Sequence, residues 1–260
     1  MSFHDWWTDS NNPSLPKSEY LYGTRHIIVL VLTALFCVIF TLLFYKRSEK
    51  AKKILFYVFG SIFLLFEVLS RVVNLIIADS YTIESVTKII LPMHICSVMV
   101  WVFIISIFTR NKMLLNFSVI GGLLATTAFL AFPAVGLNKT YMSFSCFYST
   151  FSHALGFVTV ILMLTLKQVK FEFKKIWQTF LCFAVMFAWG AFLNFVIFPG
   201  SDYMYMINDP LNLNLPFPYQ IFYIILIALY ISVFYLIGFI IDFAKKKNMK
   251  MQTESENSKA

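Results

Sequence analysis

The residues with the clearest chemical potential lie in Leu91-Pro92-Met93-His94-Ile95-Cys96-Ser97, at the start of an apolar run that ends near Phe108. A second histidine, His153, lies in a later apolar run. Ionisable side chains inside runs long enough to cross a membrane are costly to bury and usually mark function. A neutral imidazole needs both a donor and an acceptor satisfied, and a cysteine can serve as a nucleophile once its thiol loses its proton. These residues predict a site within a membrane.

The spacing of these residues indicates which of them could work together. His94 and Cys96 are two residues apart, about 200° around a regular helix, so their side chains should not face each other. A pair formed by Cys96 and His153 is the stronger hypothesis, in which the histidine accepts the thiol proton and the thiolate attacks an acyl carbonyl. A disulfide between Cys96 and Cys146 is the alternative. The four cysteines show no CxxC and no metal-ligand spacing, so neither a metal site nor a cofactor is predicted.

Other polar residues in apolar runs have a structural and a functional interpretation. Glu67, Arg71 and Asn74 are spaced i, i+4 and i+7, which places them on one helical face. Glu67 and Arg71 form either an ion pair that locks helices together or a site in which Arg71 holds an anionic headgroup, oriented by Glu67 and Asn74. Asn194 is typical of hydrogen bonding between helices. Pro92 should kink its helix and free backbone carbonyls beside the site.

The composition requires several membrane-spanning elements to carry these residues. Hydrophobic residues make up 59% of the chain, charged residues 13%, and the mean hydropathy is +0.75. A soluble domain of this length does not need so much apolar surface, whereas a set of spans of about 20 residues does. The runs show no barrel alternation, so an all-α polytopic membrane protein is predicted. Its seven expected transmembrane helices are Ile27–Tyr45, Ile54–Ala78, Ile89–Phe108, Met113–Phe132, Tyr148–Leu166, Ile176–Phe198 and Tyr219–Phe243.

Two smaller features of these runs carry predictions of their own. His26, at the start of the first run, is expected at the membrane interface. Gly121 and Gly122, in the fourth run, are expected at a point where two helices pack closely.

The distribution of basic residues predicts the orientation in the membrane. With the seven spans as given, 16 Lys and Arg residues fall on one side and four on the other, while Arg71 is intramembrane. The positive-inside rule then gives an outside N-terminus and a cytoplasmic C-terminus. The net charge of +8 is therefore a topology signal, and no nucleic-acid partner is predicted. We expect an extracytoplasmic segment (1–26), a seven-helix domain (27–243) and a disordered basic cytoplasmic tail (244–260), in a multi-pass protein of the cell membrane.

This topology brings the polar residues to a common depth. Glu67, Arg71 and Asn74 fall about 6–16 Å below the outer surface, and His94 and Cys96 about 8–10 Å below it, at 1.5 Å rise per residue. His153 and Asn194 fall near the same level, whereas the inner halves of the spans carry almost nothing comparable. The sequence therefore predicts that residues from four or five helices form one polar layer in the outer half of the bilayer.

At these residues the chain resembles the YwaF-like integral membrane proteins, a family that includes the animal transmembrane protein 164. The resemblance covers nearly the whole chain. It rests on Leu91–Ser97, on the preceding span with its glutamate and arginine, and on the later span with its histidine. The stretch Gly200-Ser201-Asp202-Tyr203-Met204-Tyr205-Met206 is similar to a G-x-N-Y-M-x-L segment of the family, with Asp202 where asparagine is usual.

The resemblance implies a phospholipid acyltransferase or transacylase with a cysteine nucleophile. In this chain the nucleophile would be Cys96, with His153 as general base and His94 as a second polar partner or oxyanion donor. Membrane phospholipids or lysophospholipids would be the substrates. The residues expected to bind substrate are Arg71, Glu67, Asn74, Asn194, Asp202 and Tyr203. Two other classes stay open: a transporter or binding subunit for a small solute, and a structural or sensory protein whose polar layer only packs helices. The sequence does not predict an oligomeric state.

Overall fold

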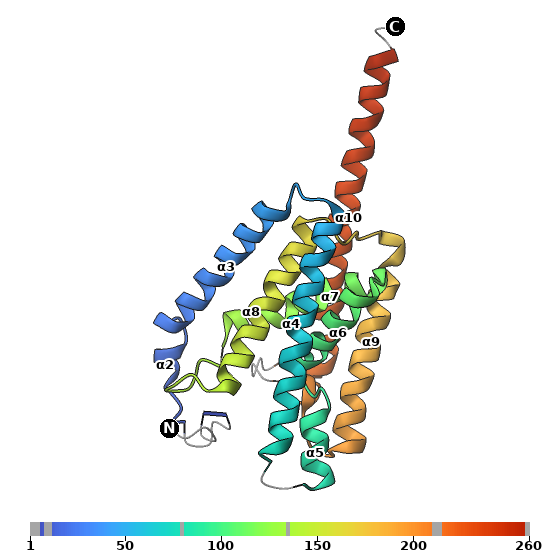
Figure 1. The fold of residues 1–260 in the computed structure, drawn as a ribbon. Helices are drawn as coiled ribbons and strands as arrows, with labels where there is room; N and C mark the ends of the chain where they lie inside the picture. Colours follow the sequence, from blue (N-terminus) through green and yellow to red (C-terminus); the bar gives the residue numbers. More distant parts are fainter. Residues whose placement is uncertain (1–5, 8–11, 79–80, 134–135, 210–214, 258–260) are drawn as a thin grey trace. The chain divides into compact units, whose positions relative to one another are not determined.

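The computed structural model describes residues 6–7, 12–78, 81–133, 136–209 and 215–257. Within these segments the chain is helical, and its only β pairing is an isolated bridge between Ser14 and Lys139. This confirms the predicted all-α class. The elements in chain order (Figure 1) are α2 (Lys17–Tyr20), α3 (Thr24–Phe44), α4 (Glu49–Ile76), α5 (Ile83–Ile90), α6 (Ile95–Thr109), α7 (Lys112–Ala131), α8 (Phe144–Thr165), η1 (Phe173–Lys175), α9 (Ile176–Phe192), η2 (Leu193–Ile197), η3 (Tyr203–Tyr205) and α10 (Tyr219–Asn257).

The long helices match the predicted membrane spans. In the described part of the chain six helices are long and apolar enough to cross a membrane, and the bent pair α5 and α6 makes a seventh if it counts as one span. Each predicted run overlaps one of these spans. Many large apolar side chains on their outer faces are exposed, Leu42 by 75%, as expected for surfaces that face lipid. The orientation of the termini stays a prediction.

The chain divides into two compact units, residues 1–169 and 170–260. The first contains α2 to α8, and the second contains η1 to α10. The division falls in the short connection between the fifth and sixth spans, and the seven-helix domain over 27–243 stays a prediction. The cysteine and the histidine of the proposed pair both lie in the first unit.

Glycines bring the helices of the first unit close together. The helix α7 packs against both α6 and α8. A Cβ atom at Gly122 would lie 2.4 Å from Cζ of Phe103, and one at Gly121 would lie 2.8 Å from Sδ of Met99. Since real Cβ contacts are essentially never so short, these two glycines let α6 approach α7. The predicted close packing at this point is confirmed.

The third span is broken where the sequence predicted a kink. Pro92 has no N–H to donate and disfavours the helical conformation of the residue before it. Leu91 is accordingly extended, with φ −81° and ψ 143°. The helix α5 ends at Ile90, α6 begins at Ile95, and the two are bent by 54°. The run predicted as one helix over 89–108 is therefore two helices, and the break exposes the N-terminal turn of α6.

The second unit is built on α9 and α10, which pack against each other. Between them the hydroxyls of Thr179 and Tyr235, both buried, are hydrogen-bonded at 2.6 Å. The helix α10 continues to Asn257. The tail over 244–260 was predicted to be disordered, but its backbone is helical as far as Asn257. A physical reason is that residues 245–257 contain no proline or glycine to end the helix.

The N-terminal segment is tied to the connection between α7 and α8. The Leu15 N–H donates to the Asn138 carbonyl at 2.7 Å, and the Thr140 N–H donates to the Pro13 carbonyl at 2.9 Å. The Arg25 guanidinium donates to two further carbonyls of this connection. The segment predicted to lie outside the spans thus has a defined place in the first unit.

His26, in the first turn of α3, is fully buried, and its expected depth at the membrane interface stays a prediction. Its Nε2–H donates to the Leu130 carbonyl at 2.7 Å, and its Nδ1 accepts from the Tyr22 N–H at 3.0 Å. Leu130 is in the last turn of α7, where carbonyls lack helical partners. Because both ring nitrogens are satisfied, this imidazole is buried without an unmet hydrogen bond.

Candidate functional site

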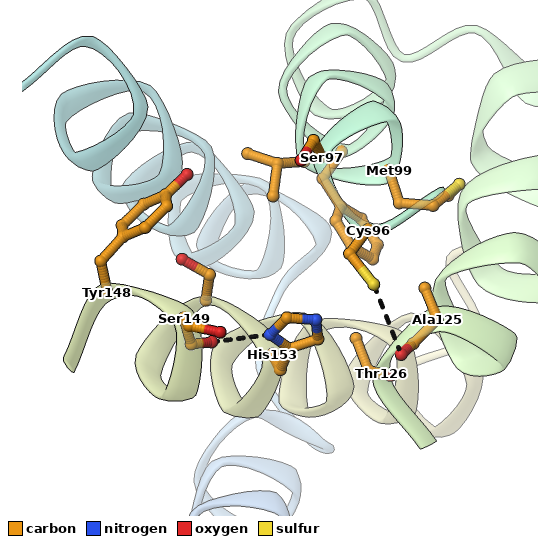
Figure 2. Close-up of a pocket in the computed structure, with 11 residues that line it drawn as sticks. Cys96, Ser97, Met99, Ala125, Thr126, Tyr148, Ser149 and His153 are labelled. Atoms are coloured by element: carbon orange, nitrogen blue, oxygen red, sulfur yellow. Dashed lines mark hydrogen bonds between the residues drawn. The ribbon is translucent and has the colours of Figure 1, made fainter. Parts of the chain in front are cut away.

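A cavity of about 120 Å³ lies between α6, α7 and α8 in the first unit (Figure 2). Its volume is several times the 10–15 Å³ or so that one water molecule needs. Cysteine, histidine, tyrosine, serine and threonine side chains share its wall with apolar ones. The lining residues are Cys96, Ser97, Met99, Val100 and Phe103 from α6, Ala125 and Thr126 from α7, and Tyr148, Ser149, Ser152 and His153 from α8.

Cys96 reaches the cavity from the second residue of α6. The break at Pro92 creates this position, because the new helix α6 begins at Ile95, one residue before the cysteine. The first N–H groups of a helix have no partners within it and carry partial positive charge, which favours an anion beside them. The side chain of the N-cap residue, His94, forms no capping hydrogen bond to them. The Cys96 thiol donates a weak hydrogen bond to the Ala125 carbonyl, with Sγ and O 3.9 Å apart.

His153 is held in one orientation by two contacts. Its Nδ1 lies 2.6 Å from the Ser149 carbonyl oxygen, and its ring stacks on Phe129 with centroids 3.9 Å apart and planes 12° apart. A carbonyl oxygen only accepts, so Nδ1 carries the proton, and in the neutral ring Nε2 carries a lone pair. Nε2 is buried and has no hydrogen-bond partner among the described residues. The imidazole therefore offers an unused acceptor at the wall of the cavity.

The structure brings Cys96 and His153 to the same cavity. Figure 2 shows the two side chains on facing walls, one from α6 and one from α8, with the Nε2 edge of the ring turned away from its bond to Ser149. They are not hydrogen-bonded to each other, because the thiol bonds to Ala125 and Nε2 is without a partner in the described chain. None of the four cysteines, all in described segments, forms a disulfide, so the alternative pairing with Cys146 is not present.

On α6 the lining of the cavity changes from polar to apolar along the helix, from Cys96 and Ser97 to Phe103. The lining residues of α8 are all polar and lie in the first ten residues of that helix. The third and fifth spans run in the same direction, so these polar ends lie at the same end of the cavity. Phe103 is 2% exposed and stacks on Phe63 with centroids 5.3 Å apart. The cavity thus suits a ligand with a polar group joined to an apolar part.

Glu67 and Arg71 lie beside this cavity and are linked to it through Tyr148. The Glu67 carboxylate is 2% exposed, and both Nε and Nη2 of Arg71 donate to its Oε1. Its Oε2 accepts a hydrogen bond from the Tyr148 hydroxyl. The third residue predicted on this face, Asn74, is exposed, donates to Ser70 Oγ at 3.4 Å and is not part of the cavity wall.

The break in the third span is also bound by Arg71. Its Nη1 donates to the carbonyls of Ile89 and Ile90 at the end of α5. The prediction that Pro92 frees carbonyls beside the site is confirmed, and Arg71 is the group that satisfies them. His94 lies in the break itself, is exposed, and does not line the cavity.

The other predicted site residues lie in the second unit. Asn194, 1% exposed, donates from Nδ2 to the Tyr203 carbonyl at 3.0 Å and accepts from the Tyr203 N–H at 2.7 Å. Asp202 accepts from the N–H groups of Ile207 and Asn208, both at 2.9 Å. Asn194 therefore holds a loop rather than a neighbouring helix, and Asp202 fixes the turn of that loop. A substrate-binding role for these residues stays a prediction.

Comparison with known proteins identifies the family. The sequence matches the TMEM164 family over residues 21–238. The chain belongs to the TMEM164 family. No curated protein and no solved structure matched it. The match confirms the resemblance noted from Leu91–Ser97, and it includes the broken span, the cavity and most of the second unit.

Several residues of the cavity could not be picked out from the sequence. Tyr148 was counted only as the first residue of a span, although tyrosine near a buried glutamate is a natural hydrogen-bond partner. The carbonyls of Ser149 and Ala125 left no sequence signal, because every residue has one. Among the described residues no group of three or more His, Cys, Asp or Glu could hold a metal ion.

Proposed function

We propose that this TMEM164-family protein transfers acyl chains between membrane lipids through a thioester on Cys96. The observation that carries the proposal is the buried, unpartnered Nε2 of His153 in the cavity that also holds the Cys96 thiol. A buried acceptor without a partner is rare in native proteins and calls for a functional reason. A proton from the thiol would supply the missing partner, and the resulting thiolate is a strong nucleophile.

Two features favour the thiolate in this position. His153 already has its proton on Nδ1, bound to the Ser149 carbonyl, so Nε2 can accept a second proton without a tautomer change. Cys96 lies in the first turn of α6, where the N–H groups favour negative charge. To form this pair the thiol must leave the Ala125 carbonyl and turn toward Nε2 across the cavity that both residues line. Such bonds are often formed only when substrate binds.

The reaction would proceed in two balanced steps. In the first, Nε2 of His153 takes the Cys96 proton, Sγ attacks the ester carbonyl of a phospholipid, and the C–O bond breaks. The leaving oxygen takes the proton from His153, giving a lysophospholipid and a thioester. In the second, His153 takes the hydroxyl proton of another lysophospholipid, whose oxygen attacks the thioester, the C–S bond breaks, and the leaving Cys96 sulfur takes the proton back from His153. N–H groups of the first turn of α6 would stabilise the oxyanion in both steps, in place of His94.

The lining of the cavity suits the reacting part of a membrane phospholipid. Its polar end has hydroxyls of Ser97, Ser149 and Ser152, which suit an ester or a glycerol hydroxyl, and its other end has Val100 and Phe103, which suit an acyl chain. The helices that line the cavity are membrane spans, so a lipid substrate could reach the cavity from the bilayer. With the orientation predicted from the basic residues, the polar end lies in the outer half of the cell membrane.

The test is acyl exchange by purified protein in vesicles. The vesicles contain a phospholipid with an isotopically labelled acyl chain and an unlabelled lysophospholipid, and mass spectrometry measures transfer of the label. We expect exchange in the wild type and a loss of at least about 100-fold in Cys96→Ala. Cys146→Ala, which removes another buried thiol from the same unit, is the matched control and should keep full activity. Exchange that survives in Cys96→Ala, or none in the wild type, contradicts the proposal.

A second candidate function is binding of a small anionic solute, and the broken third span favours it. Broken helices whose N-termini point at anionic ligands occur in transporters. This alternative predicts that octanoate protects Cys96 from iodoacetamide equally in the wild type and in His153→Ala, and that the wild type shows no acyl exchange. Acyl exchange that depends on Cys96 would exclude it.

A further inference from the structure

We infer that Arg71 is a positioning residue that fixes the N-terminal turn of α6, and not a clamp for a lipid headgroup. Its guanidinium joins three elements of the first unit. It binds the end of α5 through Nη1 and the glutamate of α4 through Nε and Nη2, and that glutamate in turn binds Tyr148 of α8. The consequence for catalysis rests on the function proposed above, whereas the positioning itself does not.

The last carbonyls of α5, at the break, need donors from outside that helix. A helix leaves its last carbonyls without helical partners, and Pro92 prevents α5 from continuing to the residues whose N–H groups would pair with Ile89 and Ile90. The Thr87 carbonyl still accepts from the Leu91 N–H at 2.9 Å. The carbonyls of Ile89 and Ile90, at the end of α5, both accept from Arg71 Nη1. Arg71 thereby supplies the hydrogen bonds that these carbonyls would have received if the helix had continued past Pro92.

Arg71 has few N–H groups left with which to bind a lipid headgroup. A guanidinium has five N–H groups in a fixed plane. Two on Nη1 serve the carbonyls, while Nε and one N–H of Nη2 serve Glu67, so within the described segments one N–H of Nη2 has no hydrogen-bond partner. A lipid phosphate would have to displace existing partners to be held by two N–H groups. Displacing Glu67 would leave a buried carboxylate without its counter-ion, which is strongly unfavourable.

The contacts from α5 through Arg71 and Glu67 to Tyr148 form a cross-link that lies next to Cys96 in the chain and in the cavity. Only the four residues 91–94 separate the bound end of α5 from the first residue of α6. The other end of the cross-link is Tyr148, which lines the same cavity as Cys96. Arg71 therefore fixes the start of the helix that carries the thiol relative to the wall that carries His153. Small displacements of a nucleophile from its attack geometry reduce rates strongly.

The experiment compares Arg71→Lys with the wild type in vesicles. Lysine keeps the charge but has no planar fork, so it cannot bind Glu67 and two carbonyls together. Hydrogen–deuterium exchange measures the amides of residues 91–98, and acyl exchange is measured with two phospholipids that share an acyl chain and differ in headgroup. Lys88→Ala is the matched control, because it removes an exposed i, i+4 ion pair with Glu84 from α5.

We expect Arg71→Lys to raise amide exchange over 91–98 at least tenfold, with little change in α4. It should lower kcat at least tenfold for both headgroups and leave KM within twofold. Unchanged amide exchange, or a raised KM for one headgroup with kcat intact, would overturn the inference. Raised amide exchange in a protein whose wild type shows no acyl exchange would contradict the proposed function and support the positioning role. If Arg71→Lys does not fold, the neutral double variant Arg71→Gln with Glu67→Gln serves the same measurements.

Discussion

His153 donates from Nδ1 to the carbonyl of Ser149, one helical turn earlier, over 2.6 Å. This bond fixes the tautomer, and stacking on Phe129 fixes the plane of the ring. Nε2 is then left at the cavity wall with a lone pair and no partner among the described residues. The bond does for this imidazole what a carboxylate does for the histidine of a catalytic triad, which is to orient the ring and set its protonation.

Replacing His153 should reduce the reactivity of Cys96 without unfolding the protein. A general base contributes about 10²–10⁴-fold to rate. We therefore expect His153→Ala to lower the rate of acyl exchange by that factor and to slow iodoacetamide alkylation of Cys96, measured by mass spectrometry of each cysteine. Cys37, Cys146 and Cys182 are internal references in the same sample. An unchanged alkylation rate at Cys96 would count against His153 as its base.

Replacing His26 should lower the stability of the protein without changing its activity. Its two ring nitrogens bind the Leu130 carbonyl and the Tyr22 N–H, and it is fully buried. Each buried group left without a partner costs about 1–3 kcal/mol. His26→Ala should thus lower the melting temperature in detergent, while the acyl exchange per folded molecule stays at the wild-type value. A loss of specific activity at unchanged melting temperature would show that His26 has a role that the contacts do not indicate.

The glycines of α7 should differ in their tolerance of a methyl group. Gly122→Ala places Cβ 2.4 Å from a carbon of the buried Phe103 ring, and this ring also lines the cavity. We expect a cost of about 1–3 kcal/mol from overpacking and a lower rate of acyl exchange. Gly121→Ala meets the flexible Met99 thioether at 2.8 Å, so its cost should be smaller and should be offset by about 1 kcal/mol of helix propensity. Thermal unfolding of the two variants tests the order, and equal destabilisation would contradict it.

The membrane spans could be predicted because their signal is local. Apolar runs of sufficient length, bounded by Lys and Arg, overlap every span of the structure. The break at Pro92 was foreseen as a kink, since proline acts on its own helix. The length of the break, residues 91–94, was not foreseen. The freed carbonyls at the end of α5 are bound by Arg71, which comes from another span and leaves no signal near Pro92.

The site could be predicted only in part, because partners from other helices leave no mark in a single sequence. Cys96 and His153 were selected as polar groups at a common depth, and the structure places both on one cavity. His26 and Asn74 show the same polar character, yet one is fully satisfied inside the protein and the other is exposed. What separates them from His153 is a hydrogen-bond count, which requires coordinates.

The most direct test of the central claim is capture of the acyl-enzyme. Purified protein is incubated with labelled phospholipid in the absence of lysophospholipid, and the cysteines are examined by mass spectrometry for an acyl adduct that hydroxylamine removes. We predict a thioester on Cys96, absent from the other three cysteines, that disappears when lysophospholipid is added and forms at least about 100-fold more slowly in His153→Ala. Labelled lipid exchange without any adduct on Cys96, or an adduct that forms at the same rate without His153, would contradict the account.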